Sequence, residues 1–100
     1  MANANFVAST ANAAASITLT NNGLIERGIT NISYSYSAVP TGGSIKVEDG
    51  AGTTIALWYV VAGGPGHIPL PATLHGTLGN NLIITIAAGG TGVIGTLLVT

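Results

Sequence analysis

The sequence predicts an all-β protein, a small antiparallel β-sandwich or barrel of the jelly-roll or immunoglobulin-like kind with about six to eight strands. Apolar and polar residues alternate with a period of two in most apolar segments, as they do in strands with one buried face. Gly, Pro and Asn residues break these segments about every 8–12 residues, which is the spacing of a sandwich or barrel. No segment carries a sustained helical period. At 100 residues the chain makes one domain.

The first strands are expected in the N-terminal third of the chain. Residues 13–20 alternate, with Ile17 and Leu19 on one face and serine and threonine on the other. Asn22-Gly23 follows, and an Asn-Gly pair favours a type I′ hairpin turn because both residues tolerate positive φ. Thr30–Ala38 alternates again, so we expect a second strand there.

The middle of the chain holds a segment that is apolar on both sides. A loop at 38–43 and a short strand at Ser44–Glu48 come first, and Asp49-Gly50 then predicts a turn. Thr53–Val61 is the next strand, and two apolar faces are expected of a strand that is covered on both sides. Its two faces are Ile55, Leu57, Tyr59 and Val61 on one side, and Thr54, Ala56, Trp58 and Val60 on the other.

The last part of the chain begins with a proline-rich segment. Gly63–Pro71 contains three prolines, which exclude a central strand and predict an edge strand or a connecting segment. We expect Ala72–Gly79 to be a loop. Asn81–Ala87 and Val93–Thr100 are the last two strands, separated by a glycine-rich turn.

These segments predict two parts of unequal size. We expect residues 1–12 to form an extended N-terminal arm and residues 13–100 to form a single β-sandwich domain. The arm is uncharged, which suits a segment that lies over a neighbouring subunit and orders on contact. It has neither the basic nor the continuous apolar region of a secretory signal, so we expect the protein to stay in the cytoplasm until it joins an assembly.

Charge is scarce and confined to a short stretch. All five Asp, Glu, Lys and Arg residues lie between Glu26 and Asp49, and the net charge is −1. Soluble domains are typically about 25% charged, whereas this chain is 5% charged. Two basic residues cannot form a phosphate-neutralising surface, so we expect no nucleic-acid partner. The composition predicts a protein whose surface is largely covered, by a membrane or by other protein.

A membrane span is the weaker of these two interpretations. Leu82–Val99 is an uncharged run of 18 residues, long enough for a spanning helix. Its interior glycines, however, make a poor helix and a good hairpin turn. No Lys or Arg flanks it to set an orientation. We therefore expect no membrane partner.

The sequence offers no constellation for chemistry. His67 and His75 are the only histidines, whereas a metal site needs three or four ligands, and there are no cysteines. Asp49-Gly50 lacks the alternating ligands of a calcium loop. The serines lack a Gly-x-Ser-x-Gly elbow and a neighbouring base. We expect a protein that is not an enzyme, with no catalytic residue, cofactor, metal or small-molecule substrate.

The candidate functional residues are apolar side chains that we expect on the outside of the sandwich. Together they would form an apolar patch larger than a monomer normally exposes. Trp58 is either a core residue or an interface anchor, because Trp is enriched in both places. The interface candidates are Phe6, Trp58, Val60, Ile83, Ile94 and Leu98.

Residues 38–99 carry a resemblance to a known group of proteins. The runs that carry it are PTGGSIKVEDGAG, AGGPGHIPLP and LHGTLGNNLIITIAAGGTGVIGTLLV. They resemble small β-sheet virion structural proteins of tailed bacteriophages, of the capsid decoration or cement type. The resemblance implies a protein on the capsid surface, assembled in the host cytoplasm, that stabilises the shell.

The resemblance and the composition together set the functional expectation. We expect a capsid decoration protein that forms a homo-oligomer, a dimer or trimer, and binds the major capsid protein. One alternative is a tail or head-fibre component. Another is a secreted filament or adhesin subunit that assembles through β-strand edges.

Overall fold

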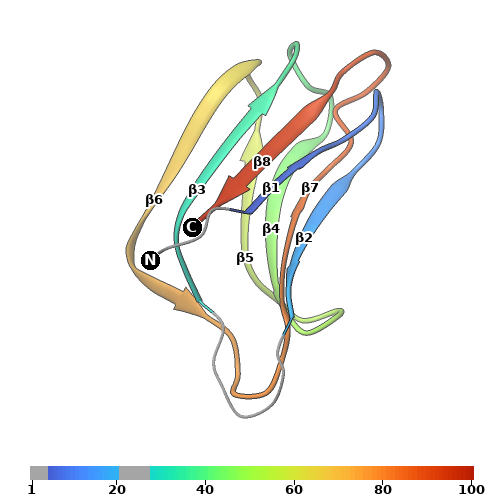
Figure 1. The fold of residues 1–100 in the computed structure, drawn as a ribbon. Helices are drawn as coiled ribbons and strands as arrows, with labels where there is room; N and C mark the ends of the chain where they lie inside the picture. Colours follow the sequence, from blue (N-terminus) through green and yellow to red (C-terminus); the bar gives the residue numbers. More distant parts are fainter. Residues whose placement is uncertain (1–4, 21–27) are drawn as a thin grey trace.

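The computed structural model describes residues 5–20 and 28–100. The expected turn at Asn22-Gly23 and the charged residues Glu26 and Arg27 lie outside the described residues. Those that are described form eight strands and no helix (Figure 1). The strands are β1 (Asn5–Ala8), β2 (Ala15–Leu19), β3 (Gly28–Tyr36), β4 (Gly43–Asp49), β5 (Thr54–Val60), β6 (Gly64–His75), β7 (Leu82–Ile86) and β8 (Gly95–Val99).

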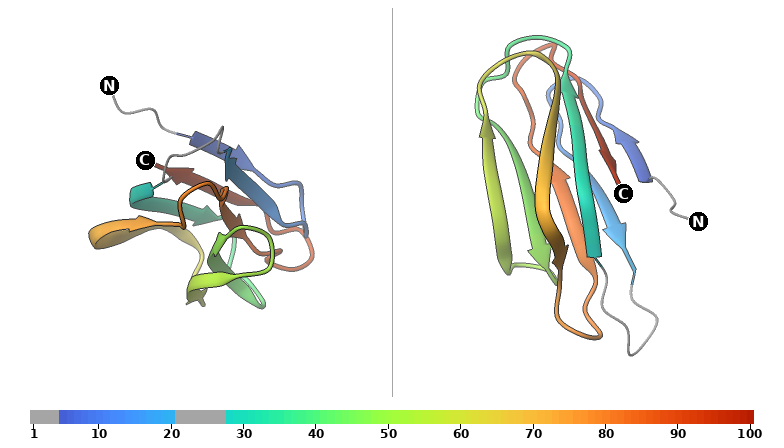
Figure 2. Two further views of the ribbon diagram at one scale, coloured as in Figure 1. Left: turned by 90° about the horizontal axis from the view of Figure 1, so that it is seen from below. Right: turned by 90° about the vertical axis from the view of Figure 1, so that its left-hand side faces the viewer.

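The strands form two four-stranded antiparallel sheets packed face to face (Figures 1 and 2). The sheet that faces the viewer in Figure 1, here called the front sheet, has the strand order β1-β8-β3-β6. The back sheet has the order β2-β7-β4-β5. Eight strands that alternate between two sheets in this order form a jelly roll. The predicted all-β sandwich is therefore confirmed, and the jelly-roll form is the one the chain adopts.

The core lies between the sheets and is built from every second residue of the central strands. Ile32 and Leu97 of the front sheet and Ile45 and Ile84 of the back sheet have no exposed surface. This arrangement follows from the period-two pattern, since alternate side chains of a strand point to opposite faces. Burial of these aliphatic groups supplies most of the stability of the fold.

Tyr36, at the end of β3, joins the two sheets through its hydroxyl group. The hydroxyl donates a hydrogen bond to the carbonyl of Ala87 at 2.8 Å and accepts one from the amide of Ser44 at 3.2 Å. The ring itself is 1% exposed. Burial raises the pKa of this phenol above its ordinary value, so the hydroxyl keeps its proton.

The first and last described strands pair in the front sheet. Asn5–Ala8 pair with β8 in antiparallel register, with Phe6 opposite Leu98. The amide of Ser9 continues the pairing with a hydrogen bond to the carbonyl of Gly95. This part of the segment that was expected to be an arm is therefore the edge strand of the sandwich.

The proline-rich segment is an edge strand, as predicted, but it runs further than expected. β6 pairs only with β3 and continues to His75, whereas the sequence predicted a loop from Ala72. The extension forms because His75 and Leu74 pair with Gly28 and Ile29 beyond an irregularity in the ladder. In the described part of the chain, no helix is long and apolar enough to cross a membrane.

Candidate interaction surfaces

The ladder with β4 decides which of the two apolar faces of β5 points into the sandwich. Trp58 lies opposite Ile45 and Val60 lies opposite Gly43 in the ladder with β4, so both side chains point into the sandwich. Val60 is only 6% exposed, and Trp58 packs against the core. Of the two positions that the sequence left open for Trp58, the structure therefore has the one against the core, and the prediction that Val60 lies on the outer apolar surface is wrong. The physical reason is that β5 is apolar on both sides, so alternation alone could not choose the inner face.

The outer face of β5 carries a continuous apolar row. Its exposed fractions are 37% for Ile55, 43% for Leu57, 79% for Tyr59 and 81% for Val61. We call these four residues the β5 row. The sequence identified them as one face, but their exposure could be recognised only from the pairing with β4.

A second apolar area lies on the outer face of the front sheet. Phe6 and Leu98 are register partners on β1 and β8, with exposed fractions of 65% and 36%. Ile94 lies just before β8 and is also exposed, and it shares the parity of Leu98 along the chain. We call Phe6, Ile94 and Leu98 the β1–β8 patch. All three were expected to be exposed, and they are.

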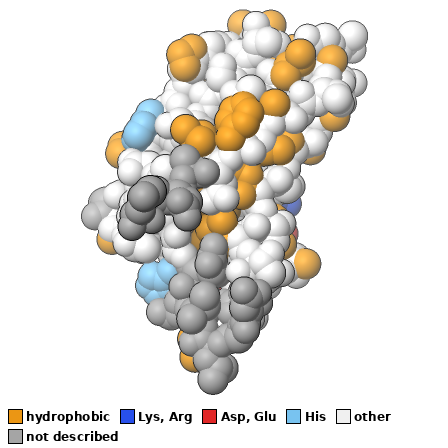
Figure 3. Space-filling model, viewed as in Figure 1, with side chains coloured by type: hydrophobic (Ala, Val, Ile, Leu, Met, Phe, Trp, Pro, Cys, Tyr) orange, Lys and Arg blue, Asp and Glu red, His pale blue; other side chains and the backbone are white. Residues whose placement is uncertain are grey.

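Figure 3 shows this side of the molecule in space-filling form. Hydrophobic side chains gather along the middle of the face, while the few blue and red atoms in view lie at its right-hand margin. Every charged side chain that the structure describes belongs to β4 of the back sheet: Lys46, Glu48 and Asp49. Among the described residues, the β1–β8 patch is therefore an apolar surface with little charge around it.

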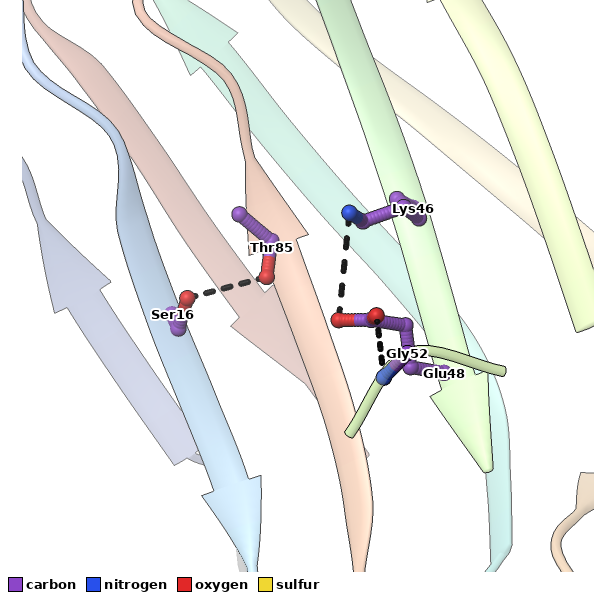
Figure 4. Close-up of polar contacts among 5 residues, drawn as sticks. All are labelled: Ser16, Lys46, Glu48, Gly52 and Thr85. Carbon is purple, nitrogen blue, oxygen red and sulfur yellow. Dashed lines mark hydrogen bonds and ion pairs between the residues drawn. The ribbon is translucent and has the colours of Figure 1, made fainter. Parts of the chain in front are cut away.

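The outer face of the back sheet is polar at its centre. Ser16 and Thr85 share a hydrogen bond of 2.9 Å, and Lys46 and Glu48 form an ion pair of 3.8 Å (Figure 4). Glu48 also accepts a hydrogen bond from the amide of Gly52 in the β4–β5 turn. Together these groups make the centre of this face polar and leave the apolar β5 row at its margin.

Ile83 belongs to this polar face. It is half-buried on β7, between Thr18 of β2 and Glu48 of β4 in register. Its outward orientation agrees with the expectation from the sequence. It is remote from the β1–β8 patch, however, because the two lie on opposite sides of the sandwich. The six interface candidates thus divide into three on the front sheet, one on the back sheet and two inside.

Asp49 fixes the loop between β6 and β7 to the end of β4. Its carboxylate accepts hydrogen bonds from the hydroxyl and amide of Thr77, at 2.6 and 2.9 Å, and from the amide group of Asn80 at 3.1 Å. The bonds from Thr77 lower the pKa of Asp49, since they favour the charged form. The sequence predicted only a turn here, and the turn is present, with Gly50 at φ 73°.

The histidines do not converge on one another. His67 lies opposite Ser33 on the outer face of the front sheet, and His75 ends the same strand eight residues further on. Eight residues of strand span about 26 Å. Among residues 5–20 and 28–100, no group of three or more His, Asp or Glu residues could hold a metal ion. In the same residues the structure forms no pocket.

Comparison with known proteins finds similarity in fold to solved structures. No protein family matches the sequence, and no curated protein matches it either. Among solved structures, a crystal structure of PirA aligns with 97% of this chain and 93% of its own, at 10% identity and a TM-score of 0.56. This likeness shows a shared fold.

Other solved structures match with TM-scores under 0.5. A designed double-stranded β-helix aligns over 98% of this chain and 97% of its own, with 11% identity and a TM-score of 0.43. A low-affinity xylan-binding module from Roseburia intestinalis covers 95% of this chain and 76% of its own, with 12% identity and a TM-score of 0.47. More distant matches include a prophage-derived protein and a virus-like particle, at TM-scores of 0.36 and 0.33.

Proposed function

We propose that this protein is a virion structural subunit, a capsid decoration protein that binds the major capsid protein through its front sheet. The single observation that carries the proposal is the β1–β8 patch. Phe6 is 65% exposed on an edge strand, directly beside Leu98, which is 36% exposed. An exposed apolar surface of this kind is typical of a protein-binding site.

The chemistry of the patch fits a broad protein surface as partner. Burial of a Phe or Leu side chain contributes about 1.5–3 kcal/mol, so Phe6 and Leu98 could anchor an interface. Many such subunits on one shell would add their weak contacts through multivalency. In this proposal the protein acts by binding and stabilising a shell rather than by catalysis.

The resemblance of residues 38–99 to small virion proteins of tailed phages supports the same assignment. The low charge supports it as well, because a subunit that works against other protein needs little charge for solubility. Under this proposal the protein is located on the capsid surface and is assembled in the host cytoplasm.

The test is co-sedimentation of the purified protein with capsids of its native virus that lack it. Phe6→Lys and Leu98→Lys place a charge in the patch, and each should weaken binding at least about tenfold. Leu78→Lys is the matched control, since Leu78 is 52% exposed in the β6–β7 loop, which Asp49 holds at the end of β4 in the back sheet. If folded Phe6→Lys and Leu98→Lys decorate the capsid at wild-type occupancy, the front sheet is not the binding surface.

A further inference from the structure

We propose that the open edge of β5 pairs with β5 of a second copy of this chain, about a two-fold axis. The pairing joins two four-stranded back sheets into one continuous sheet. It goes beyond the proposed function, because it concerns the back sheet and a second copy of the chain rather than the front sheet and a shell. Self-association is measured without capsids, so either proposal can fail alone.

The first observation is that β5 is the unprotected edge of the described fold. β1 is a strand of four residues and lies against β2, so these two edges close one side of the sandwich. β6 carries Pro65 and Pro69, which have no amide proton to donate. β5 spans Thr54–Val60 with no proline, glycine or charge. Proteins usually blunt such an edge unless it is used for pairing.

The second observation is the direction of the backbone groups. The carbonyl of Ser44 accepts a hydrogen bond from Ala87 after β7, at 2.9 Å, so the backbone groups of Ser44 point away from β5. Ser44 lies opposite Tyr59, and Lys46 lies opposite Leu57. Because these pairs are of the non-hydrogen-bonded kind, the amides and carbonyls of Leu57 and Tyr59 point to the open edge.

These groups define the register of the pairing. An antiparallel ladder with its axis at Trp58 places Leu57 of one copy opposite Tyr59 of the other, and both are hydrogen-bonded pairs. Other registers use either Ile55, where the ladder with β4 is irregular, or Val61, which lies beyond the strand. The axis at Trp58 therefore uses the regular outward-pointing groups of both copies in full.

Several features favour a second copy over a strand of another protein. A two-fold axis brings each residue near its own equivalent, so a charged edge would repel itself, whereas β5 carries no charge. The axis also merges the two β5 rows into one apolar band and places the two Trp58 side chains next to each other. Trp58 is only partly buried in one copy, so it gains cover from the other.

A closed pair follows, rather than a filament. An open chain of subunits needs a second, complementary edge on each copy. In the described fold the other edges are short, closed or rich in proline. One unprotected edge gives a dimer.

The experiment uses analytical ultracentrifugation of the whole chain over a concentration series. We expect a dimer for the wild-type protein and a monomer for Tyr59→Pro, whose lost amide proton faces the open edge and not β4. A circular dichroism spectrum checks that Tyr59→Pro keeps its β-structure. Leu57→Lys is a second variant, which retains all backbone donors and should also be a monomer. Phe6→Lys should remain dimeric.

The register is tested with single cysteines, because the chain has none of its own. Leu57→Cys and Tyr59→Cys should form a disulfide only when the two variants are mixed, since a hydrogen-bonded pair has its Cα atoms about 5.5 Å apart, within disulfide range. A monomeric wild-type protein, filaments, a folded dimer of Tyr59→Pro, or no disulfide in the mixture would each overturn the proposal.

Discussion

At the scale of single residues, Tyr36 is the side chain whose polar group contributes most to joining the sheets. Its hydroxyl satisfies the carbonyl of Ala87 and the amide of Ser44 at once. We expect Tyr36→Phe to lower the free energy of unfolding by about 1–3 kcal/mol, because both backbone groups lose their partner in a partly buried place. Urea unfolding measures this loss. Tyr59→Phe is the control at an exposed position, and equal stability of the two variants would contradict the prediction.

Measuring the stability of the wild-type protein and of Tyr36→Phe at several pH values tests this role further. The folded-state pKa of Tyr36 is raised above its ordinary value of 10.0. The stabilisation of the fold by the protonated hydroxyl of Tyr36 is therefore complete below pH 10. It is lost as the pH rises through the folded-state pKa. The stability difference between the wild-type protein and Tyr36→Phe should shrink in strong alkali.

Asp49 predicts the opposite behaviour in acid. Its pKa is lowered, first by the hydroxyl of Thr77, from an ordinary value of 3.8. Its contribution to stability is therefore present above pH 3.8 and is lost as the pH falls through the folded-state pKa. We expect Asp49→Asn to be less stable than the wild-type protein at neutral pH and to converge with it in acid. Thr77→Val should raise the pKa of Asp49 in an NMR titration, and an unchanged pKa would refute this account.

At the scale of elements, the pairing of β3 with β6 depends on Gly66. Tyr34 lies opposite Gly66 and its ring covers the glycine so closely that a Cβ there would clash with it. We expect Gly66→Ala to cost about 1–3 kcal/mol through overpacking. Chemical denaturation gives the value. In a double-mutant cycle with Tyr34→Ala the cost should largely vanish, and a cost that persists would show that the ring is not its source.

Most strands were predictable because the alternation of apolar and polar residues is regular in the sequence. β2, β4 and β7 each bury every second residue, as the pattern of Ile17 and Leu19 indicated. The prolines of β6 indicated an edge strand, because a proline has no amide proton to donate to a second neighbour. Turn glycines and prolines placed most of the strand boundaries within a few residues.

The inner face of β5 could not be predicted, and neither could the site that depends on it. Thr54–Val60 is apolar on both sides, so its sequence fits either orientation. The register of β5 with Ile45 and Val47 of β4 determines which face points inward. This pairing cannot be read from the sequence of β5 alone. The extension of β6 to His75 could not be predicted for the same reason, since it exists only through pairing with Gly28 and Ile29.

At the scale of the whole molecule, the charge that the structure describes is confined to one strand. The charged side chains that the structure describes all belong to β4: Lys46 and Glu48 lie on the outer face of the back sheet, and Asp49 lies at the end of the strand. The β1–β8 patch and the open edge of β5 are uncharged, and the two surfaces lie on different sheets. Under the two proposals, one subunit can therefore bind a shell and a second copy at the same time.

Because both surfaces are uncharged, we expect salt to have little effect on the affinity of either proposed association, the binding to a shell and the pairing of two β5 strands. Screening weakens exposed charge pairs, with a Debye length of about 10 Å at 0.1 M and about 3 Å at 1 M. Apolar burial and backbone pairing do not depend on such pairs, so we expect both dissociation constants to change less than about twofold between 0.1 and 1 M sodium chloride. Sodium sulfate should strengthen both associations, since it is excluded from apolar surface. Ultracentrifugation and co-sedimentation measure the two separately, and a tenfold weakening of either by sodium chloride would mean that charged residues, not these apolar surfaces, hold that interface together.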